Sequence, residues 1–199
     1  EAKEAAEFYT GLFPDSRILS TQILQDTPSG NAETVSFLLA GQPFESISAG
    51  PYFSLNPSIS LIVACRTAEE VDALYKALSD GGADLMPLGA YPFSPHYAWV
   101  QDRYGLTWQL MLTEGAPPAQ KITPHLLFSG AAKGKAAQAV HFYQDVFRDA
   151  GSEQVQQDAT IESGSQDSKP ALLHFRLLGQ PFSAMDHGFD ADFTFNEAF

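Results

Sequence analysis

Histidine is the residue of this sequence best suited to chemistry, and four of the five histidines follow residue 120. His125 and His174 fall within apolar runs that predict strands, and His187 directly follows Asp186. Imidazole is a common metal ligand and the natural proton carrier near neutral pH. The spacing of these histidines matches no metal or catalytic motif. We therefore interpret them as solvent-facing or hydrogen-bonded structural residues.

Cys65 is the only cysteine, so it cannot form a disulfide within the chain. It ends the run Leu61–Cys65, which is the longest purely apolar stretch. Cysteines in such strands are usually buried and inert. We expect a buried thiol with no catalytic role.

Composition narrows the class of protein. The chain has 199 residues, of which 44% are hydrophobic and 12% aromatic, enough to form a core in one or two domains. A formal charge of −13 disfavours nucleic acid and anionic lipid as partners. No apolar run approaches the length of a membrane span, and no signal peptide opens the chain. We expect a cytoplasmic protein.

The elements that position these residues are repeated. Val35–Phe44 returns as Leu173–Phe182, 138 residues later, and in each copy Gly-Gln-Pro interrupts an apolar run. This pattern predicts two strands joined by a tight turn, with both the glycine and the proline in the turn. A helical stripe repeats at an offset of 134: Ala5, Phe8, Tyr9 and Leu12 match Ala139, Phe142, Tyr143 and Val146. We expect Phe8 and Phe142 to be equally buried.

Residues 59–112 predict a complete βαβββ unit. Its helix opens with the capping-box spacing of Thr67 and Glu70, and Gly81-Gly82 ends it. The unit before it lacks an opening strand. The unit after it ends in Phe193–Phe199, which repeats Phe53–Ile59 at an offset of 140. The predicted strands of the complete unit are Ile59–Cys65, Ala83–Leu88, Tyr97–Asp102 and Leu106–Leu112.

These units predict two domains that are incomplete at both chain ends. Residues 1–112 would form a domain of two βαβββ units with the first strand missing, residues 113–120 a linker, and residues 121–199 the first half of a second domain. An incomplete unit leaves an apolar sheet face and an unpaired edge. We therefore expect either further residues at both ends or a homodimer, in which the two chains could exchange units.

The segments Glu4–Ser16, Gly41–Phe44 and Asp102–Gln109 resemble the PhnB-like branch of the glyoxalase, or vicinal oxygen chelate, superfamily, whose members often carry the label 3-demethylubiquinone-9 3-methyltransferase. The resemblance covers most of residues 1–112 and, more loosely, 121–199. It implies an α+β fold in which tandem βαβββ units form glyoxalase/bleomycin-resistance-like cupped sheets.

The resemblance also implies where a site would lie. Metal enzymes of the superfamily carry His, Glu or Gln ligands on the inner sheet face. The corresponding positions here hold Ser60 and Gln109, which are weak ligands. The strand after Gly-Gln-Pro carries Glu45, a stronger ligand, and the sequence does not decide which face of the sheet this residue occupies. We predict no metal in residues 1–112, with a divalent metal in the second domain as the alternative. The predicted substrate-binding residues are Glu45, Ser60, Trp99 and Gln109, and no catalytic residue is assigned.

The implied function is to bind or act on a small aromatic or oxygen-rich metabolite, with the reaction unknown. A non-catalytic protein that sequesters such a ligand is the alternative, and a scaffold without a ligand is a third possibility. The residues do not support the methyltransferase label, because no glycine-rich nucleoside-binding turn follows a first strand.

Overall fold

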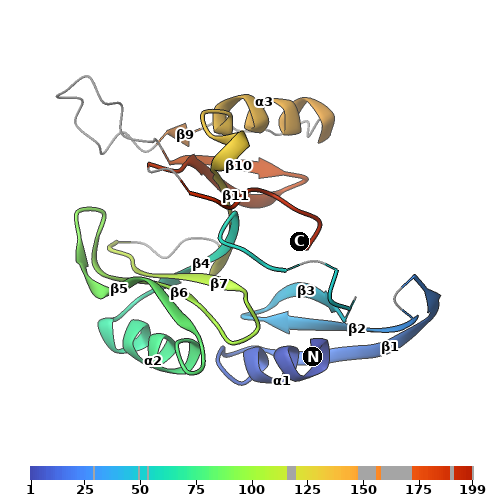
Figure 1. Cartoon of the computed structure of the whole chain (residues 1–199). Helices are drawn as coiled ribbons and strands as arrows, with labels where there is room; N and C mark the ends of the chain where they lie inside the picture. Colours follow the sequence, from blue (N-terminus) through green and yellow to red (C-terminus); the bar gives the residue numbers. More distant parts are fainter. Residues whose placement is uncertain are drawn as a thin grey trace.

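The computed structural model describes residues 1–28, 30–48, 50–52, 54–115, 120–147, 156–157, 172–188 and 191–198 (Figure 1). No helix in these residues is long and apolar enough to cross a membrane. The helices are α1 (Ala2–Thr10), α2 (Ala68–Leu78) and α3 (Ala136–Phe147), with a 3-10 turn at Gly130–Ala132. The strands are β1 (Arg17–Thr27), β2 (Gly30–Leu39), β3 (Gln42–Ile47), β4 (Ile59–Cys65), β5 (Ala83–Tyr91), β6 (Ser94–Gln101), β7 (Thr107–Leu112), β8 (Ile122–Phe128), β9 (Gln156–Gln157), β10 (Leu173–Leu177) and β11 (Gln180–Asp186).

The strand order shows how each unit is wound. In residues 59–112 the order is β5-β6-β7-β4, and the last strand, β7, runs parallel to the first, β4. Residues 122–186 have the corresponding order β8-β11-β10-β9, with β11 parallel to β8. The first unit contributes α1 and a separate sheet, β1-β2-β3. The predicted α+β class is confirmed, and residues 59–112 form the predicted βαβββ unit.

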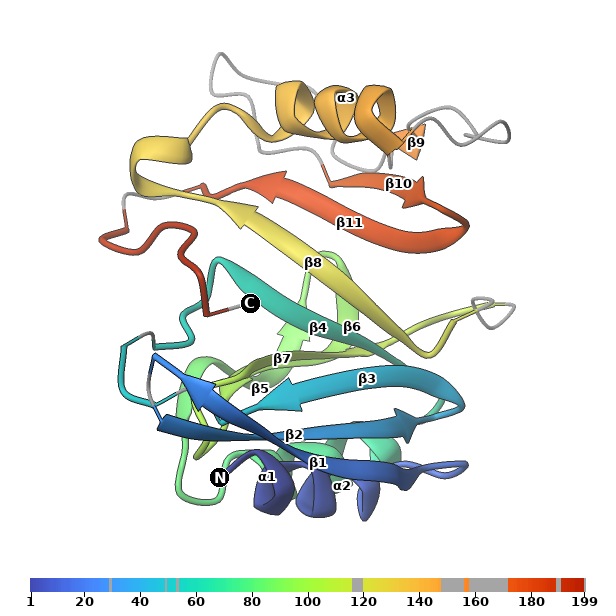
Figure 2. The same ribbon diagram turned by 90° about the vertical axis from the view of Figure 1, so that its right-hand side faces the viewer.

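The second and third units share one sheet. Their opening strands, β4 and β8, pair antiparallel, so that eight strands are continuous across residues 113–120 (Figure 2). The sequence predicted one domain made of the first and second units, residues 1–112. The pairing of β4 with β8 joins the second unit to the third, on the other side of the expected linker. The domain boundaries themselves stay a prediction. The first unit packs against the second through α1.

The hairpin in each repeat turns one residue earlier than predicted. The two turn residues are Ala40-Gly41 and Leu178-Gly179, all with positive φ between 49° and 81°. Two residues of positive φ make the turn that suits the right-handed twist of a hairpin. Pro43 therefore lies in β3, paired with Leu38, and not in the turn. A proline is tolerated there because β3 is an edge strand among the described residues, where it pairs with β2 alone.

The helices differ in how much of their apolar surface is covered. Ala2, Ala6 and Tyr9 are the buried residues of α1, and Ala136 and Val140 are those of α3. Phe8 packs at the edge of the core. Phe142, its counterpart, is 61% exposed, so the expectation that both phenylalanines are buried is wrong for α3. The helical spacing was right, but the deepest stripe lies one position from the predicted one.

Asp102 connects α1 to the second unit. Its carboxylate accepts hydrogen bonds from the Tyr9 hydroxyl at 2.8 Å and from Trp108 Nε1 at 2.7 Å. The same side chain accepts from the backbone N–H groups of Tyr104 and Leu106, which shapes the turn that Gly105 completes with a φ of 88°. Asp102 is 3% exposed. The Asp-Arg-Tyr-Gly segment therefore serves the packing of the two units.

Candidate functional site

A row of polar side chains crosses the eight-stranded sheet on one face. Paired residues on neighbouring strands share a face of a sheet, and the register places six polar residues directly opposite one another. The other face carries Leu61, Val63 and Leu110, which belong to the core under α2. We call the row the polar ladder. Its members, in strand order, are Gln101 (β6), Thr107 (β7), Ser60 (β4), His125 (β8), Ser183 (β11) and His174 (β10).

The middle of the polar ladder is closed to solvent. Ser60, Thr107 and Ser183 have no exposed surface, and His125 is 1% exposed. His125 Nδ1 lies 2.9 Å from Ser183 Oγ, in a hydrogen bond, whereas its Nε2 has no hydrogen-bond partner among the described residues. Burial, with a smaller contribution from His174, lowers the pKa of His125 to about 3. The imidazole is therefore neutral at physiological pH.

Gln109 joins the polar ladder to the aromatic side chains of β6. Its amide Nε2 donates to Ser60 Oγ at 2.7 Å, and its Oε1 accepts from the Tyr97 hydroxyl at 2.9 Å. Trp99 is paired directly with Gln109 across β6 and β7. Trp99 Nε1 is buried and has no hydrogen-bond partner in the described part of the chain. Ser60, Trp99 and Gln109 are thus brought together on one face.

Glu45 lies apart from these residues. It is exposed on β3, in the three-stranded sheet, and accepts a hydrogen bond from Ser36 Oγ at 2.8 Å. Among the described residues, no hydrogen bond links Glu45, the fourth predicted site residue, to the polar ladder.

Sequence reasoning missed several members of the site. Alternation along β7 puts Thr107 on the same face as Gln109, and this signal could have identified Thr107 as a member of the site. Ser183 had no such signal, because its place depends on the pairing of β11 with β8. His125 and His174 were interpreted as structural, and the structure places both on the polar ladder. His187 lies outside it, with its backbone N–H bonded to Phe128 O and its ring against Phe193.

The donor set does not fit the divalent ion that the fold's metal enzymes hold. Both polar atoms of the Gln109 amide are engaged in hydrogen bonds, and Ser60 is a neutral hydroxyl. The polar ladder contains no carboxylate, and the described residues contain no cluster of three His, Cys, Asp or Glu side chains. A site for a hard or borderline cation normally combines anionic oxygen or several imidazoles. We assign no metal chemistry to these residues, and the absence of a metal stays a prediction.

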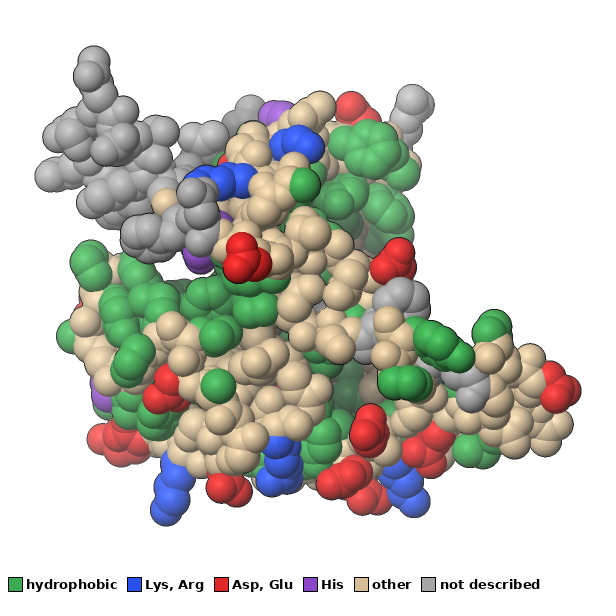
Figure 3. All heavy atoms as spheres, viewed as in Figure 1, with side chains coloured by type: hydrophobic (Ala, Val, Ile, Leu, Met, Phe, Trp, Pro, Cys, Tyr) green, Lys and Arg blue, Asp and Glu red, His purple; other side chains and the backbone are tan. Residues whose placement is uncertain are grey.

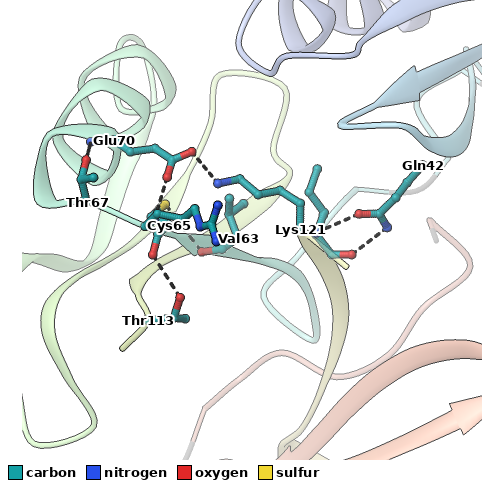
Figure 4. A network of polar contacts seen from close by, with 9 residues as sticks. Gln42, Val63, Cys65, Thr67, Glu70, Thr113 and Lys121 are labelled. Atoms are coloured by element: carbon teal, nitrogen blue, oxygen red, sulfur yellow. Dashed lines mark hydrogen bonds and ion pairs between the residues drawn. The ribbon is translucent and has the colours of Figure 1, made fainter. Parts of the chain in front are cut away.

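A second polar network holds the start of β8 where the three units meet (Figure 4). The Gln42 amide donates to Ile122 O at 2.8 Å and accepts from Ile122 N at 2.9 Å, as a neighbouring strand would. Lys121 forms an ion pair with Glu70, whose other oxygen accepts from Arg66 N at 2.7 Å. Thr67 caps α2 by accepting from Glu70 N. The glutamine of Gly-Gln-Pro thus fastens the first unit to the third.

Cys65 ends β4 within the same network. Its carbonyl accepts from Thr113 N at 2.9 Å and from Thr113 Oγ1 at 3.1 Å, while the thiol lies 3.7 Å from Val63 O. Burial raises the pKa of the Cys65 thiol to about 12. A thiol with so little thiolate is a poor nucleophile. The predicted buried cysteine is confirmed, and we interpret this network as structural.

Comparison with known proteins identifies the family. A profile of the 3-demethylubiquinone-9 3-methyltransferase family matches residues 1–111 and 120–199. The chain belongs to this family. A PhnB protein from Bacillus cereus is 40% identical over 56% of this chain and 91% of its own length, with a TM-score of 0.52. The family likeness thus covers sequence and structure, and a comparison with curated proteins gave no match.

The glyoxalase fold extends over nearly the whole chain of this family member. A glyoxalase I variant from Zea mays superposes on 94% of this chain and 64% of its own, with a TM-score of 0.61 and 12% identity. At that identity the likeness shows the fold alone. The family and the fold together make the chain a protein of the vicinal oxygen chelate superfamily.

Proposed function

We propose that the polar ladder, with Gln109, Tyr97 and Trp99, binds a small aromatic or oxygen-rich metabolite. The observation that carries this proposal is the pair of buried ring nitrogens, Trp99 Nε1 and His125 Nε2, that lack hydrogen-bond partners in the described residues. An unsatisfied buried polar atom costs about 1–3 kcal/mol, and native proteins keep few of them. Ligand oxygens would satisfy both atoms.

The spacing of these nitrogens describes the ligand. Trp99 lies on β6 and His125 on β8, three strand spacings apart, or about 14 Å along the sheet. Ser60 and Gln109 lie between them. An elongated molecule with an oxygen at each end would match this order. Both nitrogens are shielded from solvent, so neighbouring side chains must shift when the ligand enters.

The charge of the site favours uncharged ligands. The central side chains, Ser60, Thr107, Gln109 and Ser183, are neutral, and His125 is kept neutral by burial. A net charge of −13 further disfavours anions. Hydroxyl and carbonyl oxygens are the groups that such donors and acceptors bind without the cost of burying a charge.

The low pKa of His125 favours a protein that binds its ligand without catalysing a reaction. A general base works best when its pKa lies near the working pH, and the pKa of His125 is lowered to about 3. The imidazole can accept or donate a hydrogen bond to a ligand, but it is a weak base. The alternative is an enzyme in which ligand binding raises that pKa, with the reaction unassigned.

A fluorescence titration tests the proposal. The chain has two tryptophans, and Trp108 is fully buried on the core side of the sheet, so a signal that disappears in Trp99→Phe comes from the proposed site. The probes are 4,4′-dihydroxybiphenyl, 4-hydroxybiphenyl and biphenyl, which carry two, one and no oxygens on a frame long enough to reach toward both nitrogens. We expect affinity to fall in that order. Gln109→Leu should weaken 4,4′-dihydroxybiphenyl binding about tenfold, the equivalent of 1.4 kcal/mol.

Gln22→Leu serves as the matched control, because Gln22 is exposed on β1, which belongs to the three-stranded sheet and not to the sheet of the polar ladder. It should leave the affinity unchanged. Equal affinities for all three probes, or an affinity that Gln109→Leu does not alter, would contradict the proposal.

A further inference from the structure

The hairpin of β5 and β6 ends in aromatic side chains that pack on one another. Tyr91 and Phe93 lie where the chain turns, and Tyr97 follows on β6. The Phe93 ring lies edge-on to the Tyr97 ring with centroids 4.9 Å apart, and Tyr91 meets Tyr97 in the same way at 5.5 Å. Figure 3 shows hydrophobic side chains gathered over this hairpin. We call Tyr91 and Phe93 the aromatic tip.

The aromatic tip covers a member of the proposed site. Tyr97 is 3% exposed, whereas Phe93 is 58% exposed. The Tyr97 hydroxyl donates to Gln109, which in turn donates to Ser60 of the polar ladder. Trp99 follows Tyr97 by two positions on β6 and therefore lies on the same face. The aromatic tip thus lies on the outer side of the contacts that lead to the polar ladder.

The strand that carries Tyr91 is weakly paired. Among the described residues β5 is an edge strand, and its register with β6 shifts at three places between Asp84 and Tyr91. Pro87 and Gly89 lie in this part of β5. A proline cannot donate to the ladder, and a glycine adds no side chain to the packing. Segments with interrupted pairing open locally at low free energy, so residues 87–93 can move while the rest of the sheet stays folded.

The other strand of the hairpin is firmly held. Ser94, with which β6 begins, is 3% exposed, and its hydroxyl donates to Leu112 O at 3.1 Å. His96 Nε2 lies 2.6 Å from Asp72 Oδ1 on α2. By contrast, the Tyr91 hydroxyl donates to Pro87 O at 2.9 Å, a bond within residues 87–93. The hinge is therefore on β5, and the packing of the aromatic tip on Tyr97 keeps the segment closed.

We propose that residues 87–93 form a lid at the β6 end of the ligand site, which opens to admit the ligand and closes again on the occupied site. This inference rests on the proposed function, because a lid requires a ligand. Phe93 holds the lid by the same contact with Tyr97 in the empty and the occupied site. The lid therefore controls the rates of binding and release more than it controls affinity.

Stopped-flow mixing of the full chain with 4,4′-dihydroxybiphenyl, followed by tryptophan fluorescence, tests the lid. Phe93→Ala removes the contact with Tyr97. It should raise the rate constants of association and of dissociation about fivefold each, with the dissociation constant changed by less than about twofold. Fivefold corresponds to about 1 kcal/mol, which is within the range for one aromatic pair. Phe142→Ala on α3 is the matched control, because Phe142 is similarly exposed, and it should change neither rate constant.

Gly89→Ala tests the hinge in the opposite direction. Gly89 has no positive φ, and an added Cβ would meet the Tyr91 ring at 3.9 Å, so an alanine fits the closed hairpin. Alanine restricts the open segment more than the closed one, because glycine has more conformations to lose on closing. Both rate constants should fall about threefold. Amide hydrogen exchange at residues 88–91 should be faster in Phe93→Ala and slower in Gly89→Ala than in the wild type.

The lid and the proposed function fail in different ways. If the probe binds with the same two rate constants in Phe93→Ala as in the wild type, the lid is overturned and the ligand site stands. Hydrogen exchange at residues 88–91 that neither variant alters would also overturn the lid. A chain that binds no probe, with or without these changes, would contradict the proposed function and the lid with it.

Discussion

Removing the Tyr9 hydroxyl tests how the first unit is held to the second. Tyr9→Phe keeps the ring, which packs against Trp108 with centroids 5.2 Å apart, and deletes the hydrogen bond to Asp102. Burial and the nearby Asp102 raise the pKa of Tyr9, so the hydroxyl is protonated and donates at any pH that the fold tolerates.

The magnitude follows from the partners of Asp102. A hydrogen bond to a charged group contributes about 1.5–3 kcal/mol, so Tyr9→Phe should lower the free energy of unfolding by about 2 kcal/mol. Asp102→Ala leaves the Tyr9 hydroxyl, Trp108 Nε1 and two backbone N–H groups without their acceptor. We expect that change to cost about 4 kcal/mol.

The assay is urea unfolding followed by circular dichroism and tryptophan fluorescence. In a double-mutant cycle, Tyr9→Phe should cost almost nothing in the Asp102→Ala background, which gives a coupling energy of about 2 kcal/mol. Tyr143→Phe on α3 is the matched control and should change the free energy of unfolding by less than about 0.5 kcal/mol. If Tyr9→Phe lowers the free energy of unfolding no more than Tyr143→Phe does, the hydrogen bond from Tyr9 to Asp102 does not hold the two units together.

Three further predictions concern the core, the polar ladder and the junction of the units. Phe8→Ala should lower the free energy of unfolding by about 3 kcal/mol and Phe142→Ala by less than about 1 kcal/mol, as measured by urea unfolding, and equal losses would contradict the assigned burial. His125 has a pKa lowered to about 3 in the fold, so the unfolded chain takes up its proton first as the pH falls. Between pH 7 and pH 5 this residue should cost the wild type about 2 kcal/mol of stability, a loss that His125→Gln should lack, and parallel pH profiles would rule it out. Gln42→Ala should cost about 2 kcal/mol and speed hydrogen exchange at the Ile122 amide, and an unchanged exchange rate would show that the Gln42 amide does not hold β8.

The sequence predicted the individual helices and strands better than it predicted which of them lie side by side. Period-2 alternation along a strand is enough to put Gln109 and Thr107 on one face of β7, and the capping box marks the start of α2, because both signals depend on neighbouring residues. The pairing of β4 with β8 could not be predicted, since the local pattern of each opening strand does not specify which strand lies beside it. The burial of Phe8 and the exposure of Phe142 had the same sequence signal. They differ because a second unit lies against α1 and none of the described residues covers the outer face of α3.

The candidate site was predictable in part for the same reason. Gln109 follows from alternation and Ser60 from the family resemblance, and strand pairing then brings both of them beside Trp99. Glu45 lies apart from them because the strand after Gly-Gln-Pro belongs to a different sheet, and its part in ligand binding stays a prediction. Ser183 and the unpaired His125 Nε2 depend on contacts between distant strands, which no local pattern encodes.

Native mass spectrometry of the chain with 4,4′-dihydroxybiphenyl tests most directly whether the polar ladder binds a small molecule. We predict one bound molecule per chain, with occupancy that falls in Gln109→Leu and stays unchanged in Gln22→Leu. A protein that binds no 4,4′-dihydroxybiphenyl, or binds it equally in both variants, would contradict the claim that this face of the eight-stranded sheet is the ligand site.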